Sequence, residues 1–200
     1  MDYQIFSVGA FQENCIVLAR GQKAWIVDPG AEAPRIEAYL SEKGLEPELI
    51  LLTHGHFDHI GAINDLQAKH KGLPVYVHPL DAAILTHPLN CFLPDYVGIE
   101  KPEDIRDCRE LGGVEVLETP GHTPGGCAYY FAAEKLVLTG DTLFAGSVGR
   151  TDFPGGSLEA LMKSLDKLAV LPNETVVVPG HGGMTTIGAE KRGNPYFAGR

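Results

Sequence analysis

Three histidines and one aspartate lie within six residues of each other, at His54, His56, Asp58 and His59. Imidazole nitrogens and a carboxylate oxygen are ligands that suit zinc, iron or manganese. The whole chain has only 8 histidines in 200 residues, so this spacing indicates a metal site rather than a chance cluster. In an extended turn, His54 and His56 share one side, while Asp58 and His59 come where the chain enters a helix. This geometry favours two neighbouring metal ions.

Further residues of the same type follow other strands that the sequence predicts. The strands are expected at 48–52, 114–118, 136–139 and 175–178. The ligand-type residues that follow them are the 54–59 cluster, His122, Asp141 and His181. Open sheets place their sites outside the carboxyl ends of strands, so four such ends could surround one point.

The order His-x-His-x-Asp-His, then His122, Asp141 and His181, resembles the metallo-β-lactamase superfamily. Within it, the chain is similar to the short bacterial relatives of glyoxalase II, hydroxyacylglutathione hydrolase, from Val27 to Gly188. The resemblance implies an α/β fold, the αββα sandwich with two mixed β-sheets flanked by helices. It also implies one domain over residues 1–200, without the C-terminal helical domain of two-domain glyoxalase II.

The resemblance further implies a role for each ligand-type residue. The first metal would take His54, His56 and His122; the second would take Asp58, His59 and His181; Asp141 would bridge them. Asp58, His54 and Asp141 are also the expected catalytic residues. The expected cofactors are two divalent metal ions, zinc first, with iron or manganese as alternatives.

The implied reaction is hydrolysis of an S-(2-hydroxyacyl)glutathione such as S-lactoylglutathione. Two cations about 3.5 Å apart can share a hydroxide, lower its pKa towards 7 and polarise a carbonyl oxygen. A thiolate with a pKa of about 8.5 leaves with little protonation. Thioester hydrolysis therefore suits a site without an obvious general acid.

Three other functions compete with this one. Persulfide dioxygenase, on the same scaffold, would hold a single iron with His54, His122 and Asp141. A metallo-hydrolase of another substrate class is the second, although Asp141 stands where certain β-lactamases use Cys, which argues against antibiotic hydrolysis. The third, a noncatalytic metal-stabilised module, fits less well because structural zinc sites are closed and often rich in Cys.

Four residues are candidates for substrate binding: Arg150, Phe153, Lys191 and Arg192. The guanidinium of Arg150 suits a carboxylate, and glutathione has two. Its alternative is an ion pair with Asp152. Lys191 and Arg192 could supply the local basic cluster that an anionic substrate needs on a chain with a formal net charge of −10.

Composition limits the partners. A net charge of −10 argues against nucleic acid, whose binding needs Lys and Arg to neutralise phosphates. The N-terminal residues lack the pattern of a signal peptide, and no apolar run approaches a membrane span. Four scattered cysteines indicate free thiols. We therefore expect a cytoplasmic monomer or homodimer that acts on a small thioester.

The remaining pattern predicts alternating strands and helices. Strands are expected at 3–8, 15–19, 24–27, 74–78 and 127–131, and helices at 34–40, 59–70 and 158–168, the last with Ser157 as N-cap. Residues 86–113 have no steady period, so a surface connection is favoured over an excursion that flanks the site. Asp28 is either a turn residue or a carboxylate that orients a metal ligand. His70, His78 and His87 are expected to be structural or exposed.

Overall fold

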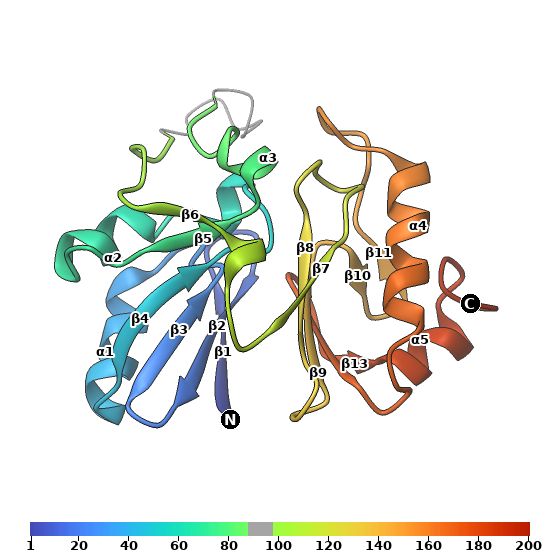
Figure 1. Ribbon diagram of the computed structural model, residues 1–200, viewed down its shortest axis with the longest axis horizontal. Coiled ribbons are helices and arrows are strands. Elements are labelled where there is room, and N and C mark those ends of the chain that lie inside the picture. The colour runs from blue at the N-terminus through green and yellow to red at the C-terminus, as the bar shows by residue number, and fades with distance from the viewer. Residues whose placement is uncertain (88–97) are drawn as a thin grey trace. The chain divides into compact units, whose positions relative to one another are not determined.

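The computed structural model describes residues 1–87 and 98–200 (Figure 1). The chain divides into two compact units, Met1–Glu110 (unit 1) and Leu111–Arg200 (unit 2). Each unit has one main β-sheet with helices packed against it. The expectation that residues 1–200 form a single domain stays a prediction.

Unit 1 contains a mixed sheet with the strand order β1-β2-β3-β4-β5-β6. The first three strands pair antiparallel, and β3 to β6 pair parallel. Alternating buried residues of these strands face the helices and form one apolar core with them. The strands are β1 (Asp2–Val8), β2 (Glu13–Arg20), β3 (Lys23–Val27), β4 (Glu46–Leu51), β5 (Val75–Val77) and β6 (Ile105–Asp107).

The helices of unit 1 are α1 (Ala33–Lys43), α2 (Ile63–Lys69) and the short α3 (Pro79–Ala82). The prediction of a helix over 59–70 is wrong in its first turn. Phe57–His59 forms a separate 3₁₀ turn, and α2 begins only at Ile63. The backbone amide of Ala62 donates to the Pro29 carbonyl at 2.9 Å and not to a carbonyl of the preceding turn. The regular helix therefore begins after Ala62.

Unit 2 contains a five-stranded mixed sheet with the order β13-β12-β9-β8-β7. Its strands are β7 (Glu115–Glu118), β8 (Cys127–Phe131), β9 (Leu136–Gly140), β12 (Val176–Pro179) and β13 (Thr185–Thr186), and β10 (Leu143–Phe144) and β11 (Ser147–Val148) form a separate hairpin. β9 and β12 are parallel, and the other pairs are antiparallel.

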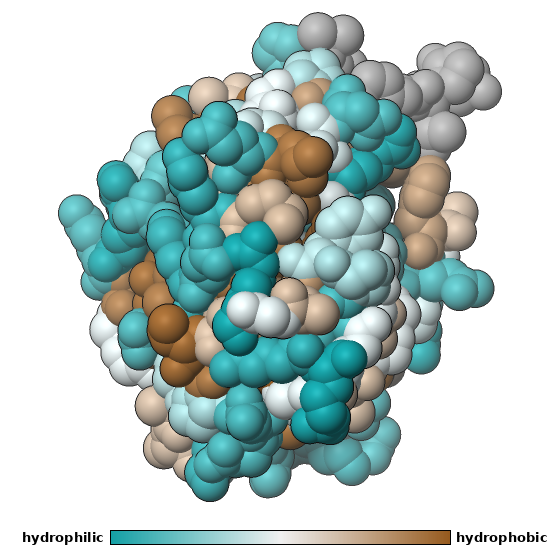
Figure 2. Space-filling view, turned by 90° about the vertical axis from the view of Figure 1, so that its right-hand side faces the viewer, coloured by the Kyte–Doolittle hydropathy of each residue, from teal (hydrophilic) through white to brown (hydrophobic). Residues whose placement is uncertain are grey.

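Two helices cover this second sheet, α4 (Leu158–Ala169) and α5 (Ile187–Gly193). The predicted cap of α4 is confirmed, because the Ser157 hydroxyl accepts from the backbone amide of Ala160. Leu165 and Leu168 of α4 and Ile187 of α5 are fully buried in the core of the unit. On the α4 and α5 side, hydrophobic side chains form separate patches among hydrophilic ones (Figure 2).

The segment 86–113, which the pattern left without structure, contains β6 and a 3₁₀ turn at Cys108–Glu110. Its central residues, 88–97, lie outside the described residues, so the expectation for that part has no structural counterpart. Mixed sheets flanked by helices confirm the predicted fold class. Within residues 1–87 and 98–200, none of the helices is both long and apolar enough to cross a membrane.

Candidate metal centre

The histidine cluster of unit 1 begins directly after β4. Because β3 and β4 are parallel, their carboxyl ends lie at the same edge of the sheet. Asp28 follows β3, and its backbone amide donates to the Leu51 carbonyl at 3.0 Å. The sheet therefore brings Asp28 next to the first residues of the cluster.

The Asp28 carboxylate is buried and accepts three hydrogen bonds. Its Oδ1 accepts from the Thr53 amide at 2.7 Å, and its Oδ2 from the Thr53 hydroxyl at 2.6 Å. The same Oδ2 lies 3.0 Å from His59 Nδ1. Asp28 also takes a positive φ of 48° and accepts a turn bond from the Gly30 amide. Both interpretations of Asp28 are therefore realised, as a turn residue and as a carboxylate that orients a ligand.

This network sets the tautomers of two histidines. Against Asp28, His59 Nδ1 must carry the proton, which leaves Nε2 with its lone pair. The single hydroxyl proton of Thr53 goes to Asp28, so Thr53 Oγ1 accepts from His54 Nδ1 at 3.1 Å. His54 is thereby also left with Nε2 as its ligand atom.

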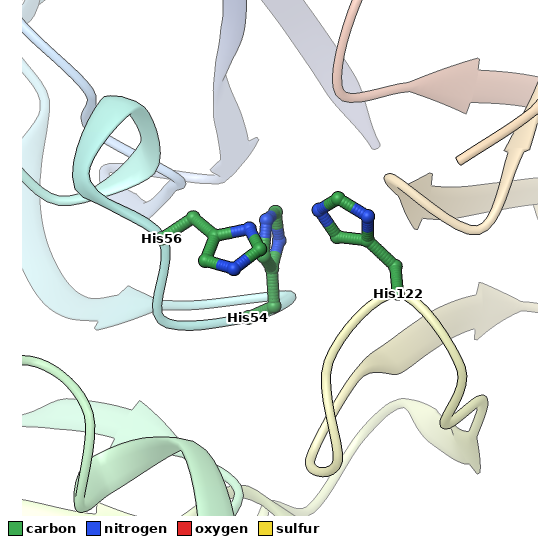
Figure 3. A group of neighbouring side chains, drawn as sticks. All are labelled: His54, His56 and His122. Carbon is green, nitrogen blue, oxygen red and sulfur yellow. The ribbon is translucent and has the colours of Figure 1, made fainter. Parts of the chain in front are cut away.

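The ring of His54 packs against the rings of both other histidines of the cluster. The centre of the His54 ring is 4.8 Å from that of the His56 ring and 4.1 Å from that of the His59 ring. One ligand-type atom each of Asp28, His54 and His59 lies within 4.8 Å of the others. Asp58 lies between His56 and His59 in the 3₁₀ turn and is half-buried. Figure 3 shows His54 and His56 on the loop after β4, and His122 on the turn between β7 and β8.

Two buried carboxylates beside this loop have no signal in residue spacing. Asp81 of α3 accepts from the Gly55 amide at 2.9 Å and so fixes the backbone between His54 and His56. Glu13 at the start of β2 is 1% exposed, and its Oε1 lies 3.8 Å from His59 Nδ1. Both come from elements that only the folded chain brings to the loop.

In unit 2, three predicted residues follow strands that run in the same direction. β7 and β9 are each antiparallel to β8, and β12 is parallel to β9. Their carboxyl ends therefore lie at one edge of the sheet, where His122, Asp141 and His181 follow them. The Gly180 amide donates to the Gly140 carbonyl at 2.9 Å, which holds the last two strand ends together.

Asp141 lies between the two histidines of this edge. Its Oδ2 is 3.4 Å from His122 Nε2 and 3.7 Å from His181 Nε2. His122 Nδ1 lies 2.7 Å from the Arg150 carbonyl, which can only accept, so Nδ1 carries the proton. Nε2 of His122 is then the ligand atom, and it faces the Asp141 carboxylate.

Gly149 permits the close approach that places the Arg150 carbonyl. A Cβ atom on Gly149 would lie 1.7 Å from the Asp141 carbonyl oxygen and 3.3 Å from His122 Nδ1. No side chain fits there without moving the backbone of a candidate ligand. The Gly149–Arg150 segment thus orients His122 through its backbone, a role that the sequence pattern did not indicate.

The side chain of Arg150 forms the ion pair that the sequence offered as its alternative. Nε and Nη2 each donate to one Asp152 oxygen at 2.7 Å. The hydrogen bond from Arg150 lowers the pKa of Asp152 to about 2. The guanidinium also lies 4.0 Å above the Phe153 ring, and that ring is 6.4 Å from the ring of His122. The presence of this ion pair does not decide whether Arg150 also binds a substrate carboxylate, so that contact stays a prediction.

The other predicted residues have simpler positions. Lys191 and Arg192 lie in the last turn of α5, and their role with substrate stays a prediction. The histidines expected to be structural or exposed agree with that expectation. His70 lies 2.7 Å from Glu37, His78 caps α3, and His87 is exposed.

The donor set fits divalent metal ions. His59 in unit 1 and His122 in unit 2 each have an oxygen acceptor at Nδ1, which fixes the tautomer and leaves the lone pair on Nε2. A carboxylate lies close to each of them, Asp28 in unit 1 and Asp141 in unit 2. Metal-binding histidines characteristically have such acceptors behind them. Nitrogen and oxygen donors without thiolate suit zinc, iron or manganese alike.

Two curated relatives cover nearly the whole chain. Probable metallo-hydrolase YqgX of Bacillus subtilis is 41% identical over 209 residues, covering 100% of this chain and 99% of that protein. Hydroxyacylglutathione hydrolase GloC of Haemophilus influenzae is 39% identical over 213 residues, covering 98% of each. Both names describe hydrolases, in agreement with the predicted enzyme class.

Solved structures share the fold. BLEG-1 B3 metallo-β-lactamase matches with a TM-score of 0.90 at 35% identity, over 99% of this chain and 100% of that one. TTHA1623 in a di-iron-bound form matches at 0.89 and 42% identity, over 96% and 99%. ETHE1 from Myxococcus xanthus matches at 0.76 and 28% identity, over 98% and 84%. The model of the metallo-β-lactamase superfamily matches residues 8–181, and the chain belongs to that superfamily.

Proposed function

We propose that this protein is a metal-dependent thioester hydrolase that acts on S-(2-hydroxyacyl)glutathione substrates such as S-lactoylglutathione. The observation that carries the proposal is the position of Asp141, whose Oδ2 lies 3.4 Å and 3.7 Å from the Nε2 atoms of His122 and His181. A carboxylate between two imidazoles suits a ligand shared by two cations. The GloC relative, named as a hydroxyacylglutathione hydrolase, supports the substrate class.

In this proposal the seven ligand-type residues form one centre with two divalent metal ions. His54, His56 and His122 would hold one metal, Asp58, His59 and His181 would hold the other, and Asp141 would be a ligand of both. The superfamily match supports this grouping because it extends across residues 8–181 and so includes every one of these positions. Zinc fits the donor set, and the di-iron form of TTHA1623 makes iron an equal candidate to test.

When bound, the two metals would supply a hydroxide nucleophile near neutral pH and a Lewis acid for the thioester carbonyl. The chain contributes fixed ligand orientation. Asp28 keeps the proton on His59 Nδ1, and the Arg150 carbonyl keeps it on His122 Nδ1. These acceptors hold each of these two Nε2 lone pairs in one direction relative to the segment that carries it.

Substrate assays test the proposal directly. Metal-loaded protein should release free thiol from S-lactoylglutathione, with activity that increases as the pH approaches neutrality. The same preparation should be assayed with a β-lactam, because BLEG-1 is named a B3 metallo-β-lactamase, and with glutathione persulfide in an oxygen electrode. Turnover of either of these, with thioester hydrolysis at background, would contradict the proposal.

Arg150 is expected to bind a substrate carboxylate. Arg150→Ala should lower kcat/KM for S-lactoylglutathione about tenfold, the effect of losing one charge-assisted contact at an exposed site. A neutral thioester, S-acetyl-N-acetylcysteamine, should be hydrolysed at the same rate by variant and wild type. Equal losses on both substrates would assign Arg150 a structural role, through the backbone that orients His122.

A further inference from the structure

We propose that Asp152 is an internal substitute for the substrate carboxylate, which holds the Arg150 guanidinium until an anionic substrate displaces it. Asp152 would thereby set the affinity of the site for substrates that carry a carboxylate. The inference rests on the proposed function for its substrate class, and on the geometry of the Arg150 segment for its mechanism.

The ion pair has the geometry of a bound ligand. Both oxygens of Asp152 accept from the guanidinium, from Nε and Nη2 at 2.7 Å each. This is the planar, bidentate arrangement in which an arginine binds any free carboxylate. Asp152 therefore occupies the same donors that a substrate carboxylate would use.

The pair is open to solvent, unlike the carboxylates that orient the histidines. The side chains of Arg150 and Asp152 are 56% and 65% exposed, whereas that of Asp28 is 2% exposed. Exposed ion pairs contribute little net stability, because water competes for both partners. A carboxylate brought in by substrate can consequently replace Asp152 at small cost, which is not possible at Asp28.

Arg150 remains in position when Asp152 leaves. Its carbonyl accepts from His122 at 2.7 Å, and its guanidinium lies 4.0 Å from the centre of the Phe153 ring. The first contact fixes the backbone to a candidate metal ligand, and the second is a cation–π contact that does not use the hydrogen-bond donors. The displaced state thus keeps a guanidinium with free donors over the Phe153 ring, whose centre lies 6.4 Å from that of the His122 ring.

Binding of S-hexylglutathione, a thioether that has both glutathione carboxylates and cannot be hydrolysed, tests the inference by titration calorimetry. Asp152→Asn should tighten its binding to the metal-loaded protein about twofold to fivefold, the range expected for loss of a competing exposed pair. In an Arg150→Ala background, the same substitution should leave the dissociation constant unchanged. A gain that persists without Arg150 would reflect the change in net charge and would overturn the proposal.

The chain offers a matched control in unit 1. Asp104 and Arg106 form an exposed pair with the same spacing of two residues, with side chains 38% and 48% exposed. Asp104→Asn removes the same charge from a pair of the same type and should not change S-hexylglutathione binding. Tightening by Asp104→Asn equal to that by Asp152→Asn would overturn the inference.

The outcomes separate the inference from the proposed function. If Asp152→Asn weakens binding or leaves it unchanged, the carboxylate orients Arg150 rather than competing for it, and the inference is wrong. If neither protein binds S-hexylglutathione, it is wrong as well. If Asp152→Asn tightens binding while the wild type hydrolyses no thioester, the inference stands and the proposed reaction fails.

Discussion

Asp141→Asn is expected to lower metal content and thioester hydrolysis together, the hydrolysis by about a hundredfold or more. Loss of a group that only hydrogen-bonds to a metal ligand already costs about 10- to 100-fold in metal affinity or activity. Asp141 is proposed as a ligand itself, and its carboxylate lies within 3.7 Å of two histidine nitrogens. Asparagine has the same shape but no negative charge, so the change removes the charge that two cations would share. Elemental analysis after dialysis, paired with a thiol-release assay, measures both quantities.

The wild type should contain close to two equivalents of zinc, iron and manganese combined. Asp104→Asn is a suitable control, because it neutralises an exposed aspartate away from the candidate ligands and should change neither quantity. Thermal unfolding of Asp141→Asn in the presence of chelator should match that of the chelated wild type. A stoichiometry of one in metal-replete wild type, or a fully active Asp141→Asn, would reject the two-metal centre.

His59→Ala and His181→Ala are expected to abolish most thioester hydrolysis, each by about a hundredfold or more. Both residues are assigned to the second metal only. A dioxygenase with a single iron would need His54, His122 and Asp141, and the two variants would leave that set complete. His122→Ala, in contrast, should abolish activity under either mechanism.

Thiol release from S-lactoylglutathione and oxygen uptake with glutathione persulfide should be measured on every variant. His70→Ala controls for removing a histidine, because His70 lies against Glu37 and belongs to no candidate ligand group. We expect little oxygen uptake by the wild type. Strong persulfide-dependent uptake that survives in His59→Ala and His181→Ala would replace the hydrolase assignment with the dioxygenase.

Much of the fold could be predicted because its central strands are buried and its main helix is amphipathic. The run at 127–131 coincides with β8, and Ser157 caps α4 as expected. The elements that the sequence did not predict are too short to show a periodic pattern of hydrophobic residues. The strands β10, β11 and β13 have two residues each, and α5 begins and ends with glycine-containing turns of low helix propensity.

The candidate ligands could be predicted because their types and order are visible in one dimension. The groups that orient them could be predicted only in part. The sequence offered Asp28 as an orienting carboxylate, as one of two alternatives and without its partner, because each such contact depends on pairing between distant segments. The acceptor for His59 lies 31 residues away at Asp28, and that for His122 lies 28 residues away. The latter is a backbone carbonyl, which every residue carries, so no residue type could have indicated it.

The contact at Gly149 determines which positions of the neighbouring segment can be varied in protein engineering. Position 149 is closed to every other amino acid, because a Cβ there would lie 1.7 Å from the Asp141 carbonyl oxygen. Asp152, by comparison, has a side chain that is 65% exposed and free of that constraint. A library meant to change substrate preference should therefore randomise positions 151–153 and keep Gly149 fixed, so that its members differ in specificity and not in whether they hold metal.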